Sequence, residues 1–335
     1  MSIARLLVEQ AGPITTIQEG GRTGYMRYGV PHSGPIDRLA FAAAHAALGN
    51  PPGSALVELS LGGISLICEE GQVDFALCGA DFSAELDGVR LGPWSVASLG
   101  PGSRLRVREG AAGNWAYLAF AGQLNAEKWL ESRATHLLAA LGGGLVQPGR
   151  QLTIDPARSS GGARPLPPPP DAAPIARAAI VPGPQERYFG PDAINNLAAG
   201  TYSASARFDR MGRLLDGAPL VPTKLDMISE PAVRGSLQVD GEGRLTILLA
   251  DHQTTGGYPK IATAAGAHVD RIAQLAPGAS LEFDLISVEA AAALWREHAE
   301  RTNAYLNELQ KPPGEIGTRL LSANLIDGIF DARYE

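Results

Sequence analysis

The residues best suited to chemistry lie together in one short loop behind an apolar run. Residues 245–250 have the apolar character of a strand, and residues 251–260 then read Asp-His-Gln-Thr-Thr-Gly-Gly-Tyr-Pro-Lys. An ordinary hairpin turn needs only about two to five residues, with a Gly, Asn or Asp where φ is positive. Here acidic, amide, hydroxyl and ammonium groups surround a Gly-Gly pair that lets a ligand approach the backbone. The pattern predicts a binding site, and the alternative is an elaborate turn that caps a strand.

These side chains suit a small, planar ligand that resembles an amide. Asp251 can accept a proton or orient a donor, and the Gln253 amide offers an acceptor and donors to an amide or lactam edge. Lys260 can stabilise negative charge that develops on oxygen. We therefore predict Asp251, Gln253 and Lys260 as catalytic residues. The other polar side chains can hydrogen-bond a carbonyl oxygen or stack on a ring, and are predicted to bind substrate: Thr254, Thr255 and Tyr258.

Two glycine-rich loops each hold an arginine that can bind an anion, and both arginines are predicted to bind substrate. Arg22 lies among glycines, and its planar guanidinium suits a carboxylate or a phosphate. The alternative for this loop is a structural role, in which Ser33 or Asp37 caps the following helix. Arg210 lies in the sequence Phe-Asp-Arg-Met-Gly-Arg, and is either a second anion clamp or the partner of Asp209 in a salt bridge.

The absence of common catalytic signatures narrows the choice. No lysine follows a glycine, so a Walker A phosphate loop is excluded, and the Gly-x-Ser-x-Gly elbow of serine hydrolases does not occur. No Met-Lys pair is present either, so we expect no biotin attached to this chain. The six histidines show no short spacing that suits a metal ion, and we expect no metal site.

Composition limits the class of protein. The chain has 335 residues, of which 45% are hydrophobic and 19% charged, and a formal net charge of −7. This balance offers no basic surface for nucleic acid, so no nucleic-acid partner is expected. No run approaches the ~20 apolar residues that span a bilayer, and the first residues lack the apolar region of a signal peptide. We expect a cytoplasmic protein without a membrane partner. Cys68 and Cys78 can pair or stay free.

A proline-rich segment divides the chain into near halves. Residues 156–174 contain four consecutive prolines and are interpreted as a stiff linker between an N-terminal domain, 1–155, and a C-terminal domain, 175–335. The halves echo each other, because Leu-x-Pro-Gly-x-x-Leu-x-Val at 99–107 recurs as Leu-x-Pro-Gly-x-x-Leu-x-Phe at 275–283. The echo indicates two β domains related by an internal repeat.

Short apolar runs separated by turn residues predict a mainly β fold of barrels or sandwiches with a few helices. Helices are expected at 36–48, where Gly49 supplies the stop, and at 288–310, which is long and amphipathic. The predicted strands are 55–61, 73–78, 104–108 and 115–120 in the first half, and 178–181, 201–206, 235–239, 245–250 and 280–286 in the second.

Three blocks of sequence resemble one known family. They are Gly-Val-Pro-His-Ser-Gly-Pro-Ile-Asp at 29–37, Asp-Arg-Met-Gly at 209–212 and Asp-His-Gln-Thr-Thr-Gly-Gly-Tyr-Pro-Lys-Ile-Ala-Thr at 251–263, with Gly-Pro-Gln at 183–185. The blocks are similar to the allophanate hydrolase subunit 2 family, also called KipA-like or biotin-dependent carboxyltransferase-like. This family includes one subunit of prokaryotic 5-oxoprolinase.

The resemblance implies a fold, an activity and partners. The implied fold is two cyclophilin-like β-barrel domains. The implied activity is that of a 5-oxoprolinase complex, which uses ATP to open 5-oxo-L-proline to L-glutamate, with an unconventional nucleotide site here or a site in a partner. The implied partners are a subunit 1 or KipI-like protein, a LamB/YcsF-like third subunit, and a small amide or lactam substrate.

The eight candidate site residues match the family motifs, while three other positions depart from them. His252 stands where relatives usually have Arg, Glu19 where Asp is commoner, and His45 where Asn is usual. These departures affect the prediction of the substrate more than the assignment to the family. Two alternatives therefore stay open. One is a carboxyltransferase subunit that acts on urea or a related amide with carboxybiotin from another chain, and the other is a non-catalytic KipA-like regulator that binds a KipI-like partner.

Overall fold

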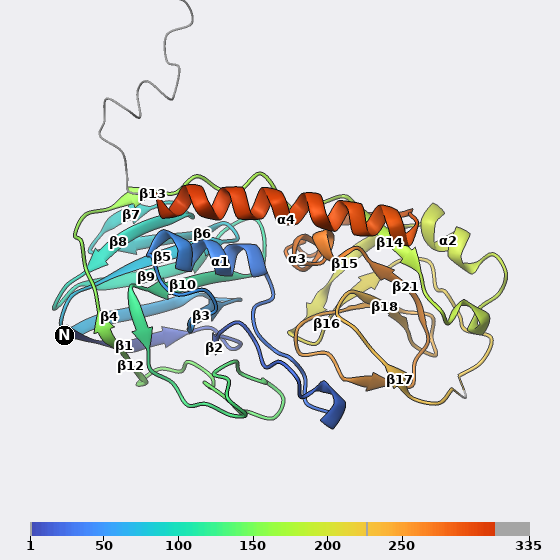
Figure 1. Cartoon of the computed structure of the whole chain (residues 1–335), viewed down its shortest axis with the longest axis horizontal. Coiled ribbons are helices and arrows are strands. Elements are labelled where there is room, and N and C mark those ends of the chain that lie inside the picture. Colours follow the sequence, from blue (N-terminus) through green and yellow to red (C-terminus); the bar gives the residue numbers. More distant parts are fainter. Residues whose placement is uncertain (1, 226, 312–335) are drawn as a thin grey trace, which may run out of the picture.

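The two halves of the chain fold differently and lie side by side (Figure 1). The computed structural model describes residues 2–225 and 227–311. In the first half the strands form two sheets, and in the second half they close into a barrel. The predicted mainly β fold with a few helices is confirmed. The closed barrel is in the second half, and two separate hydrogen-bonded sheets stand where the resemblance implied a first barrel.

The first half is a stack of two sheets and a helix. Helix α1 (Arg38–Ala47) packs on β5 (Val73–Gly79) and β10 (Ala116–Phe120) of the six-stranded sheet. The seven-stranded sheet has the order β11 (Gly122–Leu124), β12 (Gln151–Ala157), β1 (Ser2–Ala11), β4 (Ile64–Glu70), β9 (Arg104–Glu109), β6 (Phe82–Leu86) and β7 (Val89–Leu91). The six-stranded sheet has the order β13 (Arg164–Pro165), β8 (Ser95–Leu99), β5 (Val73–Gly79), β10 (Ala116–Phe120), β3 (Leu56–Leu59) and β2 (Thr16–Gln18).

Burial on both faces explains the central strands of this stack. Phe75 and Leu118 belong to the core of the first half, whereas their neighbours Ala76 and Tyr117 pack in the core that includes α1. Successive side chains of a strand point to opposite faces, so β5 and β10 are covered on both sides. Such strands are apolar without interruption, which is the pattern that predicted them from sequence.

The two cysteines are free and lie in different parts of the packing. Cys68 is buried in the core of the first half, and Cys78 is buried in the core that continues toward α1 and the second half. The disulfide that the sequence left open is therefore not formed.

The second half is built around a closed seven-stranded barrel. The short strands β17 (Glu230–Pro231) and β20 (Thr255–Gly256) pair with each other outside it. The barrel order is β14 (Arg177–Pro182), β21 (Lys260–Ala264), β18 (Ser236–Val239), β19 (Leu245–Leu248), β16 (Gly212–Asp216), β15 (Thr201–Phe208) and β22 (Ser280–Leu285). The shorter helical segments are η1 (Met26–Tyr28), η2 (Glu186–Tyr188), α2 (Ala193–Ala199) and α3 (Gly266–Ala273).

Helix α4 (Val288–Gln310) ties the halves together. Figure 1 shows it running along the top of both halves, and it contacts α1 in the first half and α3 and β14 in the second. Ser287 begins the helix by accepting a hydrogen bond from the Ala290 amide (3.2 Å). Near its end, the Tyr305 hydroxyl donates to the Pro167 carbonyl (2.7 Å). Among the residues described, no helix combines the length and the apolar content needed to cross a membrane.

The segment predicted as a linker is packed against the first half. Strand β12 continues to Ala157, and β13 pairs with β8. Leu166 is only 3% exposed, so the segment contributes to the core. The proposed spacer between the halves is thus part of the folded structure, although the division into halves remains visible in the sheets. Residues 312–335 of the predicted C-terminal domain lie outside the described residues.

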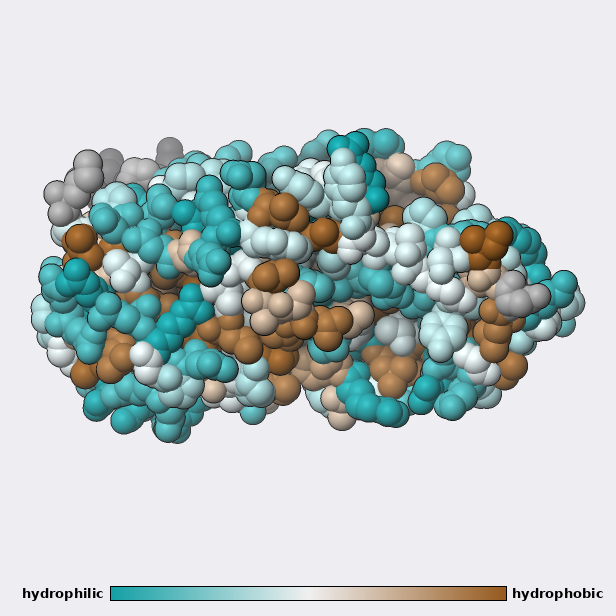
Figure 2. Space-filling model, turned by 90° about the horizontal axis from the view of Figure 1, so that it is seen from below, coloured by the Kyte–Doolittle hydropathy of each residue, from teal (hydrophilic) through white to brown (hydrophobic). Residues whose placement is uncertain are grey.

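The lower face of the molecule has mixed polarity. Figure 2 shows that side toward the reader, with apolar side chains gathered near the middle and polar ones toward the first half's outer end. Tyr28 of η1 is 67% exposed and Ile228, close in sequence to β17, is 86% exposed. Single exposed apolar side chains are common on protein surfaces, whereas a contiguous apolar patch marks a contact surface.

Polar side chains cross between the halves beneath α4. Gln274, at the end of α3, accepts a hydrogen bond from the Asn114 amide (2.9 Å) and donates to Asp37 Oδ2 (2.9 Å). Asp37 also caps α1, because its Oδ1 accepts from the Ala40 amide (2.9 Å). Burial raises the pKa of Asp37 to about 6, and the negative charge of Asp270 adds to the rise.

Asp37→Asn should remove a pH dependence of folding stability. The pKa of Asp37 in the folded protein lies above the ordinary value of 3.8, so its protonation stabilises the fold below pH 6, and this contribution is lost as the pH rises through 6. Between pH 7 and pH 5, we expect the wild type to gain about 1 kcal/mol of unfolding free energy relative to the variant. Urea denaturation at both pH values measures the difference. Equal changes in the two proteins would contradict the assignment.

Candidate functional site

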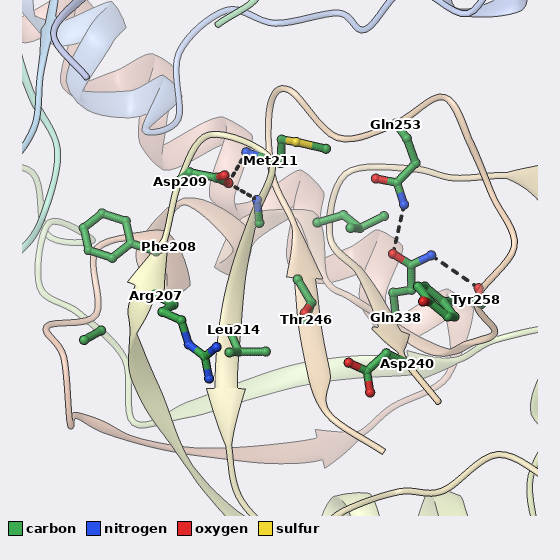
Figure 3. Close-up of a pocket in the computed structure, with 13 residues that line it drawn as sticks. Arg207, Phe208, Asp209, Met211, Leu214, Gln238, Asp240, Thr246, Gln253 and Tyr258 are labelled. Atoms are coloured by element: carbon green, nitrogen blue, oxygen red, sulfur yellow. Dashed lines mark hydrogen bonds between the residues drawn. The ribbon is translucent and has the colours of Figure 1, made fainter. Parts of the chain in front are cut away.

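A cavity of about 530 Å³ lies on the outer face of the barrel, over β15, β16, β19 and β18 (Figure 3). Leu214, Thr246 and Gln238 line it, one from each of three neighbouring strands. Their sequence neighbours Leu215 and Ile247 instead point into the barrel core. This follows from the alternation of side chains along a strand, which gives the outer face its own set of residues.

Two glutamines form the amide wall of the cavity. Gln253 Nε2 donates to Gln238 Oε1 (2.9 Å), and Gln238 Nε2 donates to the Tyr258 carbonyl (3.4 Å), as Figure 3 shows. Within the described part of the chain, the Gln253 side-chain oxygen has no hydrogen-bond partner, and each amide keeps a second N–H. A Cβ at Gly256 would lie 2.8 Å from Gln238 Nε2, so a side chain there would displace the Gln238 amide. The wall therefore offers both an acceptor and donors to a ligand.

The sequence identified one of these glutamines and missed the other. Gln253 lies in the predicted loop, but Gln238 lies within the apolar strand β18 and is only 7% exposed. The available signal was an amide side chain within a short predicted strand, because buried polar side chains need hydrogen-bond partners. Tyr258, predicted to bind substrate, lines the cavity and is 49% exposed.

Lys260 lies behind this wall. It pairs with Gln238 across β18 and β21, so the two side chains share a face of the sheet. Its side chain is buried, and among the described residues its ammonium has no hydrogen-bond partner. Burial lowers the pKa of Lys260, against the opposing effect of Glu230. The backbone amide of Lys260 donates to Gln185 Oε1 (2.7 Å), which attaches the Gly-Pro-Gln motif to this strand.

Thr254 and Thr255 take part in the pairing of β20 with β17 and do not line the cavity. The Thr254 carbonyl accepts from the Ala232 amide (3.0 Å), and Thr255 pairs with Pro231 in the β17–β20 ladder. Neither threonine is among the residues that line the cavity. Their predicted binding role has no geometric support in the described residues, whereas their backbone positions the strand next to Gln253.

Arg210 and Asp251 lie in the interface between the halves, away from the cavity wall. Arg210 Nε donates to Asp251 Oδ2 (3.0 Å), its Nη2 donates to Asp251 Oδ1 (3.1 Å) and to the Gly34 carbonyl (2.6 Å), and its Nη1 pairs with Glu58. The three charged side chains are at most 1% exposed. Burial acts to lower the pKa of Arg210, but Asp251 and Glu58 outweigh it and raise this pKa above its ordinary value. Arg210 is therefore already neutralised, and the salt bridge is with Asp251 rather than with Asp209.

Arg22 belongs to the first half and lies close enough to Asp251 for that carboxylate to raise its pKa, against the larger effect of burial. Its Nε donates to the Trp129 carbonyl (3.0 Å), its Nη2 donates to the Ala134 carbonyl (2.8 Å), and the guanidinium stacks 4.5 Å from the Trp129 ring. It is 1% exposed, and burial lowers its pKa. The described structure thus divides the predicted site residues between two places. It brings Gln253 and Tyr258 into the cavity with Lys260 behind them, and it brings Arg22, Arg210 and Asp251 close to one another between the halves.

The closed barrel, the cavity on its outer face and the order of the motif loops can be compared with known protein families. Residues 28–285 match the family described as "Carboxyltransferase domain, subdomain A and B", and the chain belongs to this family. The predicted family relationship is confirmed.

The similar proteins include 5-oxoprolinase subunits and urea carboxylases. The chain is 31% identical to a 5-oxoprolinase subunit of Haemophilus influenzae over 88% of this chain and 94% of that protein. It is 29% identical to a putative urea carboxylase of Emericella nidulans, over 86% of this chain but only 25% of the relative. The crystal structure of Kluyveromyces lactis urea carboxylase matches 93% of this chain and 30% of that one, with a TM-score of 0.79 at 23% identity, and supports the fold.

Arg210→Ala should destabilise the fold strongly. The substitution leaves Glu58 and Asp251 buried without a cation, and breaking a buried ion pair in this way costs about 3–5 kcal/mol. The matched control is Arg177→Ala, because the ion pairs of Arg177 are largely exposed, and we expect it to change stability by less than about 1 kcal/mol. Denaturant unfolding measures both. A stable Arg210→Ala protein that lost only ligand binding would contradict the structural role.

Proposed function

We propose that this chain is a subunit of an ATP-dependent 5-oxoprolinase complex that hydrolyses 5-oxo-L-proline to L-glutamate in the cytoplasm. The sequence similarity to the Haemophilus influenzae 5-oxoprolinase subunit extends over nearly the full length of both chains, which supports this choice over relatives that match only in part. The observation that carries the proposal is the Gln253–Gln238 wall, because a lactam presents an N–H and a carbonyl side by side.

The proposed chemistry uses the wall and the residues behind it. Gln253 holds the lactam by its amide edge, and the apolar side chains Leu214 and Leu248 lie against the ring methylenes. Lys260 does not line the cavity, so its proposed role is to stabilise from behind the wall, by its positive charge, the charge that develops on the carbonyl oxygen when water adds and the ring C–N bond breaks. Its buried ammonium, without a partner among the described residues, supports that role. Asp251 acts through Arg210 in holding the loop.

ATP is assigned to the complex and not to this cavity. The charged side chains that line the cavity are Arg207, Asp209 and Asp240, which together are net negative. A triphosphate requires several cations or a glycine-rich phosphate loop, so these residues do not fit it. We therefore place the nucleotide on a partner, either the subunit 1 or KipI-like protein or the LamB/YcsF-like third subunit. The apolar side chains that gather near the middle of the lower face support such an association (Figure 2).

A second candidate function is carboxyl transfer to urea or a related amide with carboxybiotin from another chain. The similarity to a putative urea carboxylase favours it, and urea is also a planar amide that the same wall can bind. A third candidate is a KipA-like regulator, which binds a KipI-like partner without turnover.

Glutamate release from 5-oxo-L-proline with ATP separates these candidates. The assay compares this chain alone, with subunit 1, and with subunit 1 and the LamB/YcsF-like protein. Release that requires all three supports the proposal. ATP-dependent carboxylation of urea with a biotin carrier, and no glutamate release, would support the second candidate. A tight complex without either activity would support the regulator.

Gln253→Ala should lower kcat/KM of the complex about tenfold, because the amide loses a hydrogen bond worth roughly 1–1.5 kcal/mol. Gln123→Ala is the matched control, since Gln123 is exposed on β11 of the first half, and we expect its kcat/KM to equal that of the wild type. The measurement is the initial rate of glutamate release over a range of substrate concentrations. Equal activity of the two variants would remove Gln253 from the site.

A further inference from the structure

Arg207 is a cation that the sequence analysis did not select, and it lines the cavity (Figure 3). It lies in β15 where the pairing with β16 is irregular. Ala204 pairs with Leu215 and Phe208 pairs with Arg213, so residues 205–207 stand opposite Leu214 alone. Extra residues of this kind form a bulge, which turns side chains away from the regular alternation. As a result Arg207 and its neighbour Phe208 both line the cavity.

The guanidinium of Arg207 is not paired with a carboxylate in the described residues, in contrast to that of Arg210. Within residues 2–225 and 227–311, no carboxylate oxygen lies within 4.0 Å of the Arg207 guanidinium, and its side chain is exposed. The two carboxylates that share the cavity form hydrogen bonds with other groups and do not pair with Arg207. Asp209 Oδ1 accepts from the Met211 and Gly212 amides (2.7 and 3.1 Å), and Asp240 Oδ2 accepts from Arg244 Nε (2.8 Å).

Arg207 and the amide wall stand on opposite sides of the cavity. Figure 3 shows Arg207 on one side and Gln238 on the other, with Leu214 and Thr246 between them. Their strands, β15 and β18, are separated by β16 and β19. Three strand spacings of about 4.8 Å place the two backbones roughly 14 Å apart. The side chains of Arg207 and Gln238 occupy part of this distance, and the space between them fits one small molecule.

We propose that Arg207 binds the carboxylate of the substrate while Gln253 and Gln238 bind its amide edge. The ligand class is a small cyclic amide that carries a carboxylate, and its identity as 5-oxo-L-proline rests on the proposed function. Arg207 thereby fills the role that the sequence suggested for Arg210. A guanidinium pairs with a carboxylate through two parallel N–H donors, which also orients the ring.

The experiment separates recognition of the carboxylate from recognition of the amide. Calorimetric titration of the full chain compares 5-oxo-L-proline with 2-pyrrolidinone, which has the same lactam without the carboxylate. We expect Arg207→Gln to weaken binding of 5-oxo-L-proline about tenfold and to leave binding of 2-pyrrolidinone unchanged, since only the first makes the charged hydrogen bonds. Arg207→Lys should recover part of the affinity. Arg106→Gln is the control, because Arg106 is also exposed but lies on β9 of the first half.

The same variants in the complex give a second readout. We expect Arg207→Gln to raise KM for 5-oxo-L-proline about tenfold with little change in kcat. An unchanged KM, or equal losses for both ligands, overturns the role of Arg207 even if the complex releases glutamate. Conversely, if no mixture releases glutamate but Arg207→Gln still weakens only the carboxylate ligand, the proposed function fails and the binding role of Arg207 stands.

Discussion

The rest of the structure depends on one buried arginine. Arg210 reaches from the turn between β15 and β16 to Glu58 in the first half and to Asp251, which begins the loop of the amide wall. Charges this deeply buried are tolerated only when they are paired and hydrogen-bonded. The same contacts fix both edges of the cavity, because Arg207 lies three residues before Arg210 and Gln253 lies two residues after Asp251. The residues that looked most catalytic thus position those that line the site.

The fold explains how one scaffold serves relatives with different names. The barrel core and the two sheets are held by apolar packing and by α4, while the outer face of the barrel carries a few polar side chains that do not contribute to that core. Changes on this face leave the fold intact, so the family can include both 5-oxoprolinase subunits and parts of urea carboxylases. In the site proposed for this chain, the amide pair and Arg207 select the ligand.

Much of the fold could be predicted from sequence because its signals are local. The buried strands and the helices at 36–48 and 288–310 were marked by apolar runs, periodicity and stop residues. The site could be predicted only in part. Gln253 and Tyr258 belong to one polar loop, but the partners of Arg210, Asp251 and Glu58, lie 41 and 152 residues away in sequence, so no local pattern distinguishes an anion clamp from a structural ion pair. Arg207 was missed because its orientation depends on a bulge.

The most direct test of this account is a crystal structure of the chain with 5-oxo-L-proline bound. The account predicts the lactam ring on the outer face of the barrel, with its N–H and carbonyl oxygen within hydrogen-bond distance of Gln253 and its carboxylate at Arg207. Arg210 should keep its contacts with Glu58 and Asp251. A ligand bound instead at Arg22 or between the halves, with Arg210 released from Asp251 to hold its carboxylate, would contradict the central claim.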